Sequence, residues 1–292
     1  MGVRLLHSFI NEKCLNSMHK IHLKQLHNKK IAVDISIYMY KFKRSNTLIE
    51  NIFNMCTLFR NYNIHPIFVF DGKPPKEKEE EIQKRNMKKQ KYKENEEEYN
   101  KRVITQEDID HVKQLLSVYG LSFVTAKGEA DNLCAYLCKT KKVFACLSED
   151  TDMFVFGCCY VLRYFSILHH NVILYNLKSI LRELRLTAKE FKWLCVISGT
   201  DYQINNQNII NNMYEKLIEY KTKDHDNISK FSSKPLFESL CNMEELKHIL
   251  QHIYHISKTD FSSYEDLLIE NKSFNKSDVI QYLKQFNFIS IS

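Results

Sequence analysis

Pro66-Ile67-Phe68-Val69-Phe70-Asp71 is an unbroken apolar run that ends on a carboxylate. Lys30-Ile31-Ala32-Val33-Asp34 and Val143-Phe144-Ala145-Cys146-Leu147-Ser148-Glu149-Asp150 have the same form. Continuous apolar runs, unlike alternating ones, indicate strands that are buried on both faces of a parallel sheet. Between these runs, apolar residues recur at helical spacing, as they do from Ile109 to Leu116. This alternation predicts an α/β fold with a mostly parallel central sheet flanked by helices.

The composition of the 292-residue chain is that of a globular protein, because 44% of its residues are apolar. Its 6 glycines and 4 prolines are too few for a turn-rich all-β sandwich or barrel. No apolar run approaches the roughly 18–20 residues that cross a bilayer, and the N-terminus lacks the features of a signal peptide. The 9 cysteines indicate reduced core thiols, since Cys134 and Cys138 lack the second pair that a zinc site requires. We therefore expect an intracellular protein without a membrane-spanning segment.

Residues 73–102 interrupt this pattern with a highly charged segment that has hardly any large apolar side chains. Its middle, residues 84–93, is basic without an acidic residue, and the chain as a whole has a net charge of +7. A charged helix without an apolar stripe cannot bury a face, so the segment must project into solvent or pass over something. Two interpretations stay open: a solvated helical hairpin, or a positive arm over a nucleic-acid backbone.

Seven carboxylates follow buried runs or occur in closely spaced pairs. Each of them alone has an ordinary explanation as a helix N-cap, a turn former or a solvated charge. Because ligand sites of α/β sheets lie beyond the carboxyl ends of the strands, we expect these side chains to gather there. The seven are Asp34, Asp71, Glu129, Asp131, Asp150, Asp152 and Asp201.

Carboxylates gathered at one edge require cations, because close like charges raise one another's pKa. Mg²⁺ suits such a site, since it prefers oxygen ligands, keeps waters and accepts phosphate oxygens. Two such ions stabilise the attacking and the leaving oxygen when a phosphodiester is hydrolysed. The absence of a Gly-rich phosphate loop disfavours an ATPase, and the absence of histidine among these carboxylates disfavours a histidine-dependent phosphoesterase.

Motifs from residue 1 to about 205 carry a resemblance to a known family. They are Met1-Gly2-Val3, Val33–Phe42, Phe68–Pro75, Gly128–Asp131, Glu149–Asp152 and Gly199–Tyr202. In order and spacing they resemble the XPG/flap-endonuclease family of structure-specific 5′ nucleases. The resemblance implies a PIN-like 5′ nuclease fold with a basic helical arch, and two Mg²⁺ ions that Mn²⁺ can replace.

The resemblance also implies which residues hold the metals and contact DNA. The first metal would be held by Asp34, Asp71, Glu129 and Asp131, and the second by Asp150, Asp152 and Asp201, with Glu129 reaching both. The N-terminus at Gly2 would lie close to the DNA. The basic side chains that would contact DNA are Lys84, Lys88, Lys89, Lys91 and Lys93.

Three further side chains match residues of the family that act on the scissile phosphate or its neighbouring base. Lys78 and Arg85 correspond to a catalytic basic pair, and their spacing of seven residues puts both on one helical face. Such a pair would stabilise the charge that develops on the phosphate. Tyr40 corresponds to an aromatic residue on which a base stacks, and its alternative role is that of a core aromatic.

The C-terminal part differs from the family pattern in two ways. Residues 204–210 contain none of the glycines of the family's helix–two-turn–helix, which puts its monovalent-cation site in doubt. No sliding-clamp peptide is found, because Gln281–Phe286 has the wrong register. We expect one catalytic domain formed by residues 1–105, with the arch at about 73–105, and by residues 106–205, followed by a helical region at 206–292.

These features predict a divalent-metal-dependent DNA endonuclease that cuts 5′ flaps or junctions in replication, repair or recombination. The same carboxylates would serve a 5′→3′ exonuclease on duplex DNA or RNA ends, but an arch that can pass over a single strand favours the endonuclease. A non-catalytic nucleic-acid-binding protein is disfavoured, because none of the seven carboxylates is lost. We expect a monomer that binds branched or 5′-flapped DNA in the nucleus, or in a host nucleus if the Asn-, Lys- and Ile-rich composition reflects a viral genome.

Overall fold

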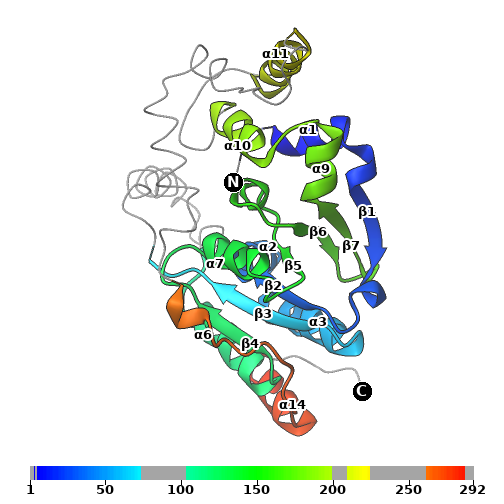
Figure 1. Ribbon diagram of the computed structural model, residues 1–292. Helices are drawn as coiled ribbons and strands as arrows, with labels where there is room; N and C mark the ends of the chain where they lie inside the picture. Colours follow the sequence, from blue (N-terminus) through cyan, green and yellow to red (C-terminus); the bar gives the residue numbers. More distant parts are fainter. Residues whose placement is uncertain (1–2, 4, 74–102, 199–208, 224–260, 287–292) are drawn as a thin grey trace, which may run out of the picture. The chain divides into compact units, whose positions relative to one another are not determined.

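The structure is a computed structural model that describes residues 3, 5–73, 103–198, 209–223 and 261–286 (Figure 1). These residues belong to two compact units. The first unit comprises Met1–His19, Asp150–Val161 and Leu174–Asp260, and the second comprises Lys20–Glu149, Leu162–Ile173 and Phe261–Ser292. The domain boundaries expected from the sequence stay a prediction.

A 7-stranded sheet has the strand order β1-β7-β6-β5-β2-β3-β4. Its strands are β1 (Met18–His22), β2 (Lys30–Asp34), β3 (His65–Phe70), β4 (Ser122–Thr125), β5 (Ala145–Leu147), β6 (Tyr160–Ser166) and β7 (Asn171–Asn176). The pairs β5–β2, β2–β3 and β3–β4 are all parallel. The three apolar runs form β2, β3 and β5, and almost all of their strand residues are buried, as the sequence predicts. The predicted fold class is therefore confirmed.

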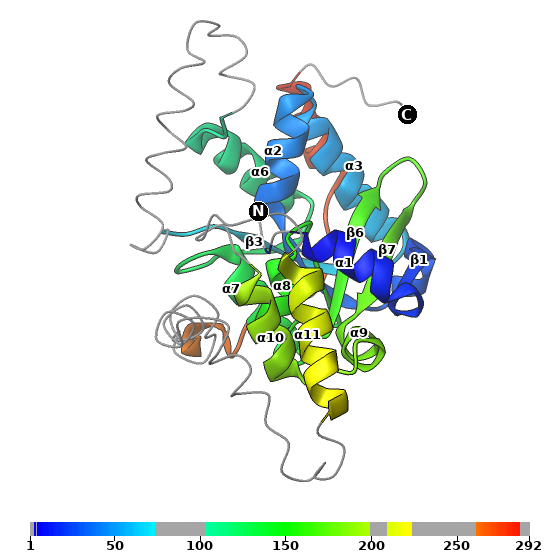
Figure 2. The same ribbon diagram turned by 90° about the horizontal axis from the view of Figure 1, so that it is seen from above.

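Helices of the second unit cover both faces of its parallel strands. They are α2 (Ile35–Arg44), α3 (Leu48–Asn61), α6 (Gln106–Val118) and α7 (Ala130–Lys139). A further helix, α14 (Lys276–Lys284), packs against α6. Figure 2 shows the sheet from its edge, with α2, α3 and α6 on one side of β3 and α7 on the other. The helix expected around Ile109–Leu116 is α6, and α14 lies within the C-terminal region expected to be helical.

The first unit contains helices α1 (Leu6–Lys13), α8 (Asp152–Phe156), α9 (Leu177–Glu183), α10 (Ala188–Ile197) and α11 (Ile209–Lys223). Helices α1 and α11 meet through Phe9 and Tyr214, whose rings lie edge to face at 5.2 Å. A capping box of Thr187 and Glu190 begins α10, and Lys221 of α11 binds the Glu190 carboxylate at 3.0 Å. Burial raises the pKa of Glu190, but the Thr187 amide and the Lys221 ammonium outweigh it and leave that pKa below its usual value.

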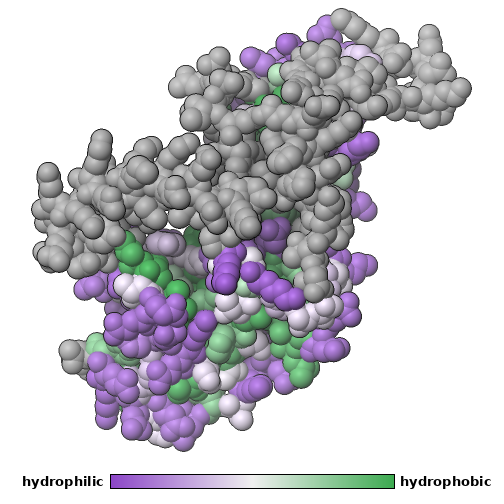
Figure 3. Space-filling model, turned by 90° about the vertical axis from the view of Figure 1, so that its left-hand side faces the viewer, coloured by the Kyte–Doolittle hydropathy of each residue, from purple (hydrophilic) through white to green (hydrophobic). Residues whose placement is uncertain are grey.

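Figure 3 shows one face, on which the described residues are mainly hydrophilic and apolar side chains occur in small groups between polar ones. None of the described helices has the length and hydropathy that a bilayer crossing requires.

Helix α6 begins with a second capping box, formed by Thr105 and Asp108. The Thr105 hydroxyl accepts from the Asp108 amide, Asp108 accepts from the Thr105 amide at 2.9 Å, and Lys43 binds Asp108 at 2.7 Å. Burial raises the pKa of Asp108, but the hydrogen bonds from Lys43 and Thr105 lower it by more, so the net pKa lies below the usual value.

A group with a lowered folded-state pKa stabilises the fold above its unfolded-state pKa, and this contribution is lost as the pH falls through the folded value. Asp108→Ala should therefore lower the free energy of unfolding by about 1 kcal/mol at neutral pH. The difference from the parent should shrink as the pH falls below about 4. Urea denaturation across this pH range measures both effects, and a difference that does not depend on pH would contradict the assignment.

Candidate metal centre

The carboxyl ends of the parallel strands in the second unit carry predicted metal ligands. Asp34 is the last residue of β2 and is 3% exposed. Its Oδ2 accepts a hydrogen bond from Ser148 Oγ at 3.0 Å, and Ser148 follows the last residue of the adjacent strand β5. The side chain of Asp34 is thus fixed at the edge of the sheet by a hydroxyl from the neighbouring strand end.

The start of helix α7 brings three more of these carboxylates to the same edge. Asp71 directly follows β3, and its Oδ1 accepts from the Ala130 amide, the first of α7, at 2.8 Å. Glu129 is the N-cap residue of α7, and Asp131 lies in its first turn. The positive end of the helix dipole favours anionic side chains there, which offsets part of their mutual repulsion.

This arrangement provides carboxylate ligands without a closed cage. Among the described residues, no three acidic side chains bring a carboxylate oxygen each within 4.8 Å of one another. Mg²⁺ usually keeps several waters and takes only one or two protein carboxylates. An all-oxygen edge of this kind fits a magnesium ion better than zinc, which favours nitrogen and sulfur ligands.

Two glycines hold the loop after β3 against the loop after β4. The Gly72 amide donates to the Gly128 carbonyl at 2.7 Å, and the Ala126 amide donates to the Phe70 carbonyl at 2.9 Å. A Cβ atom on Gly72 would lie 1.9 Å from the Ala126 carbonyl oxygen, so only glycine permits this approach. The contact fixes Asp71 relative to the loop that leads into Glu129.

Gly72→Ala should therefore separate the two loops and lower the free energy of unfolding by about 1–3 kcal/mol, the usual range for overpacking. Gly128→Ala is the matched control, because its Cβ would meet only the Lys73 carbonyl, at 3.9 Å. Urea denaturation of both variants compares them. If the two variants had equal free energies of unfolding, the close approach of the loops at Gly72 would not require glycine.

In the first unit, Asp150 and Asp152 form a local turn at the start of α8. Asp150 is 5% exposed, and its Oδ1 accepts from the Asp152 amide at 2.9 Å. Asp152 is the first residue of α8. The i, i+2 spacing of this pair therefore has a local structural cause as well as a predicted role in metal binding.

Glu149, next to Asp150 in the chain, is anchored within the second unit. Its carboxylate accepts from the Tyr164 amide at 2.7 Å and from the Tyr38 hydroxyl at 3.4 Å. Arg163 donates to the Glu149 carbonyl at 2.8 Å and lies 3.7 Å from its carboxylate. Burial, with Glu149 and Asp34 nearby, raises the pKa of Tyr38 well above 10.0, so this hydroxyl stays protonated and can donate. These contacts, which sequence reasoning missed, make Glu149 a structural anchor for the segment after β5.

Tyr40 lies on α2 and is 45% exposed, whereas Tyr38 and Met39 beside it are buried. This exposure disfavours the core role and is what stacking on a base requires. The other predicted DNA contacts and three predicted site residues lie outside the described residues. These are Gly2, Lys78, Lys84, Arg85, Lys88, Lys89, Lys91, Lys93 and Asp201, together with residues 74–102 of the arch and residues 204–208 of the hairpin.

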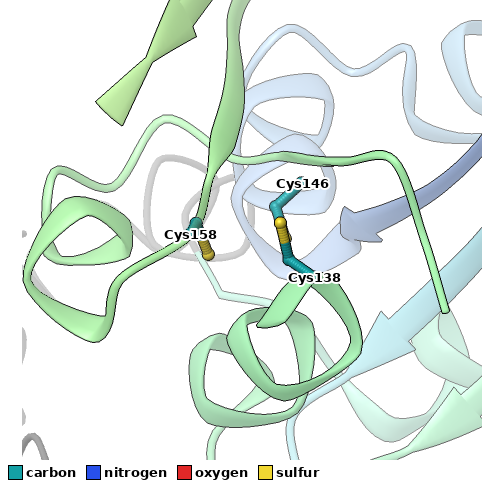
Figure 4. A group of neighbouring side chains, drawn as sticks. All are labelled: Cys138, Cys146 and Cys158. Carbon is teal, nitrogen blue, oxygen red and sulfur yellow. The ribbon is translucent and has the colours of Figure 1, made fainter. Parts of the chain in front are cut away.

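Two cysteines of the second unit lie with their sulfur atoms facing each other (Figure 4). Cys138 of α7 and Cys146 of β5 have Sγ atoms within 4.8 Å, and Cys146 Sγ donates to the Cys134 carbonyl at 3.0 Å. Both thiols are buried. The pair supplies half of the four ligands of a tetrahedral zinc site, and its local contacts are those of packed interior thiols.

Comparison with known proteins places these features in a family. The XPG N-terminal domain matches residues 1–92, and the XPG I-region matches residues 120–201. Flap endonuclease 1 of Encephalitozoon cuniculi is 31% identical over 69% of this chain and 68% of its own length. Flap endonuclease 1 of Glycine max is 32% identical over 69% of this chain, which spans 62% of the length of that relative.

Solved structures agree in fold. The catalytic core of Rad2 in complex with a DNA substrate has a TM-score of 0.65 and 23% identity, over 97% of this chain and 95% of the other. Flap endonuclease-1 from Methanococcus jannaschii has a TM-score of 0.62 and 22% identity, over 97% of each chain. The family domains, the curated relatives and the arrangement of carboxylates at the sheet edge agree: the chain belongs to the XPG/flap-endonuclease family.

Proposed function

We propose that this protein is a divalent-metal-dependent, structure-specific DNA endonuclease that hydrolyses phosphodiester bonds at 5′ flaps or junctions. One observation carries the proposal: Asp34, Asp71, Glu129 and Asp131 all lie where parallel strands end or where α7 begins. Their oxygen donors match the ligand preference of Mg²⁺. Membership of the flap-endonuclease family supports DNA as the substrate, in replication, repair or recombination.

These four residues would hold the first of two Mg²⁺ ions, and Mn²⁺ would substitute. We assign the second ion to Asp150, Asp152 and Asp201, an assignment that rests on the sequence motifs. Bound ions of this kind lower the pKa of a coordinated water and stabilise the charge on the attacked phosphate. The chain's own part is to fix its carboxylates, as the Ser148 hydroxyl does for Asp34 and the α7 amide does for Asp71.

Basic and aromatic residues would orient the DNA. Lys78 and Arg85 would bind the scissile phosphate, and the basic residues of the arch would bind the backbone by charge. Tyr40 offers an exposed ring for a base beside the cut. We further propose that the protein acts as a monomer inside the cell, in the nucleus.

The products formed from a 5′-labelled flap test the proposal. In Mg²⁺, release of the intact flap is expected, and a chelator should stop the reaction. Release of mononucleotides from the 5′ end, or faster cleavage of an RNA end, would instead identify a 5′→3′ exonuclease with the same carboxylates. No cleavage of any of these substrates in Mg²⁺ or Mn²⁺ would overturn the proposed activity.

A further inference from the structure

The C-terminal segment Phe261–Phe286 of the second unit wraps around elements that precede it by more than a hundred residues. The ring of Phe261 stacks on Tyr136 of α7, with centroids 4.3 Å apart and planes at 12°. Farther along, Ser122 of β4 donates to the Glu270 carbonyl at 3.1 Å. We call this segment the C-terminal strap; Figure 1 draws it in orange and red.

Tyr264 is the residue of the strap that reaches the loop between β4 and α7. Its side chain is 6% exposed. Its hydroxyl accepts from the Lys127 amide at 2.9 Å and donates to the Thr125 carbonyl at 3.4 Å. One buried hydroxyl therefore satisfies a donor and an acceptor of the backbone where the chain leaves β4.

This loop leads directly to two predicted metal ligands. Lys127 precedes the N-cap Glu129 by two residues, and Asp131 lies in the first turn of the same helix. On its other side, the loop is held by the hydrogen bond from Gly72 to the Gly128 carbonyl. The loop is thus hydrogen-bonded to the segment after Asp71 on one side and to the strap on the other. The hydroxyl of Tyr264 makes the contact on the strap side.

We infer that Tyr264 is a positioning residue for Glu129 and Asp131, an inference that rests on the proposed function. Without the hydroxyl, the Lys127 amide and the Thr125 carbonyl lose this partner, so the loop is held less firmly on the strap side. Metal ligands tolerate displacements of only about half an ångström. Loss of a group that orients ligands typically costs about 10–100-fold in metal affinity or activity.

Tyr264→Phe isolates the hydroxyl, because the ring near Phe261 is retained. Tyr282→Phe is the matched control: its hydroxyl belongs to the same strap, donates to the His111 carbonyl at 2.8 Å and is 3% exposed, but it contacts α6 and not the ligand loop. Both variants remove one buried hydroxyl that is bonded to the backbone. They differ in the backbone segment that is affected, and Tyr264→Phe removes two hydrogen bonds where Tyr282→Phe removes one.

The first measurement is Mn²⁺ affinity in the absence of DNA, and the second is the single-turnover cleavage rate as a function of Mg²⁺ concentration. For Tyr264→Phe we expect Mn²⁺ affinity to fall by about tenfold or more. High Mg²⁺ should restore its cleavage rate, because the loss lies in the occupancy of the metal site. For Tyr282→Phe, both quantities should stay within about twofold of the parent.

Equal Mn²⁺ affinities for Tyr264→Phe and Tyr282→Phe would overturn the inference even if the parent cleaves flaps. If the parent cleaves no substrate, the proposed function fails, but the Mn²⁺ titration still decides whether Tyr264 positions the ligands.

Discussion

Asp34→Asn should reduce the single-turnover rate of flap cleavage in Mg²⁺ by about a thousandfold. Losses of this size are found when an enzyme loses a group that stabilises charge in the transition state. Asparagine has nearly the same shape and can still accept the hydrogen bond that Ser148 donates to Asp34 at 3.0 Å. The substitution therefore removes the negative charge from the end of β2 while the packing around it is retained. The rate loss should reflect lost metal binding, not unfolding.

Ser148→Ala is the matched control for this prediction. It removes the hydroxyl that orients Asp34 but leaves the carboxylate charge in place. We expect a loss of about tenfold in rate, as for other groups that orient ligands. If Asp34→Asn cleaved as fast as Ser148→Ala, the charge of Asp34 would not be needed for catalysis.

Asp150→Asn and Asp152→Asn should each abolish cleavage while DNA binding is retained. Affinity for DNA comes mainly from cationic side chains at phosphates, so removing an anionic charge leaves it unchanged or increases it. Each asparagine can still form the short turn in which Asp150 accepts from the Asp152 amide at 2.9 Å. The measurements are flap cleavage in Mg²⁺ and flap binding by fluorescence anisotropy in Ca²⁺.

Glu149→Gln provides a neighbouring control, since Glu149 is held by Tyr164 and Arg163 and is not a predicted ligand. Glutamine keeps an oxygen that can accept from the Tyr164 amide, so cleavage should fall by less than about tenfold. Near-parental turnover by Asp150→Asn or Asp152→Asn would contradict the assignment of the second metal to this pair.

The parallel part of the fold follows from the sequence because its strands are buried on both faces. In runs such as Ile67–Phe70 every residue is apolar and buried, which is the pattern of a strand covered on both faces. The acidic residue at the end of such a run falls at the carboxyl edge of the sheet. Parallel register then gathers Asp34 and Asp71 at one edge without further information.

The β6–β7 pair was not expected from the sequence. Its connection, Ile167–His170, contains no glycine or asparagine, the residues that mark hairpin turns. His170, the last residue of this connection, nevertheless adopts a positive φ of 49°. The turn signal is absent from the sequence because a residue other than glycine or asparagine occupies the left-handed conformation here.

Contacts between distant segments were also beyond sequence reasoning. Tyr264 and Lys127 are 137 residues apart, and Tyr38 and Glu149 are 111 apart. A hydroxyl that bonds to a backbone amide or a carboxylate leaves no periodic pattern, because the partner depends on the tertiary fold. For this reason the residues that position the carboxylates emerge only from the structure, whereas the carboxylates themselves stand out in the sequence.

Counting Mn²⁺ ions bound by the protein, by electron paramagnetic resonance, tests most directly whether the carboxylates at the sheet edge are a metal site. The parent should bind two ions per chain, and the double variant Asp34→Asn/Asp71→Asn should lose at least one of them, with its far-UV circular dichroism unchanged. Equal stoichiometry and equal affinity in the parent and the double variant would contradict the assignment of these carboxylates to a metal centre.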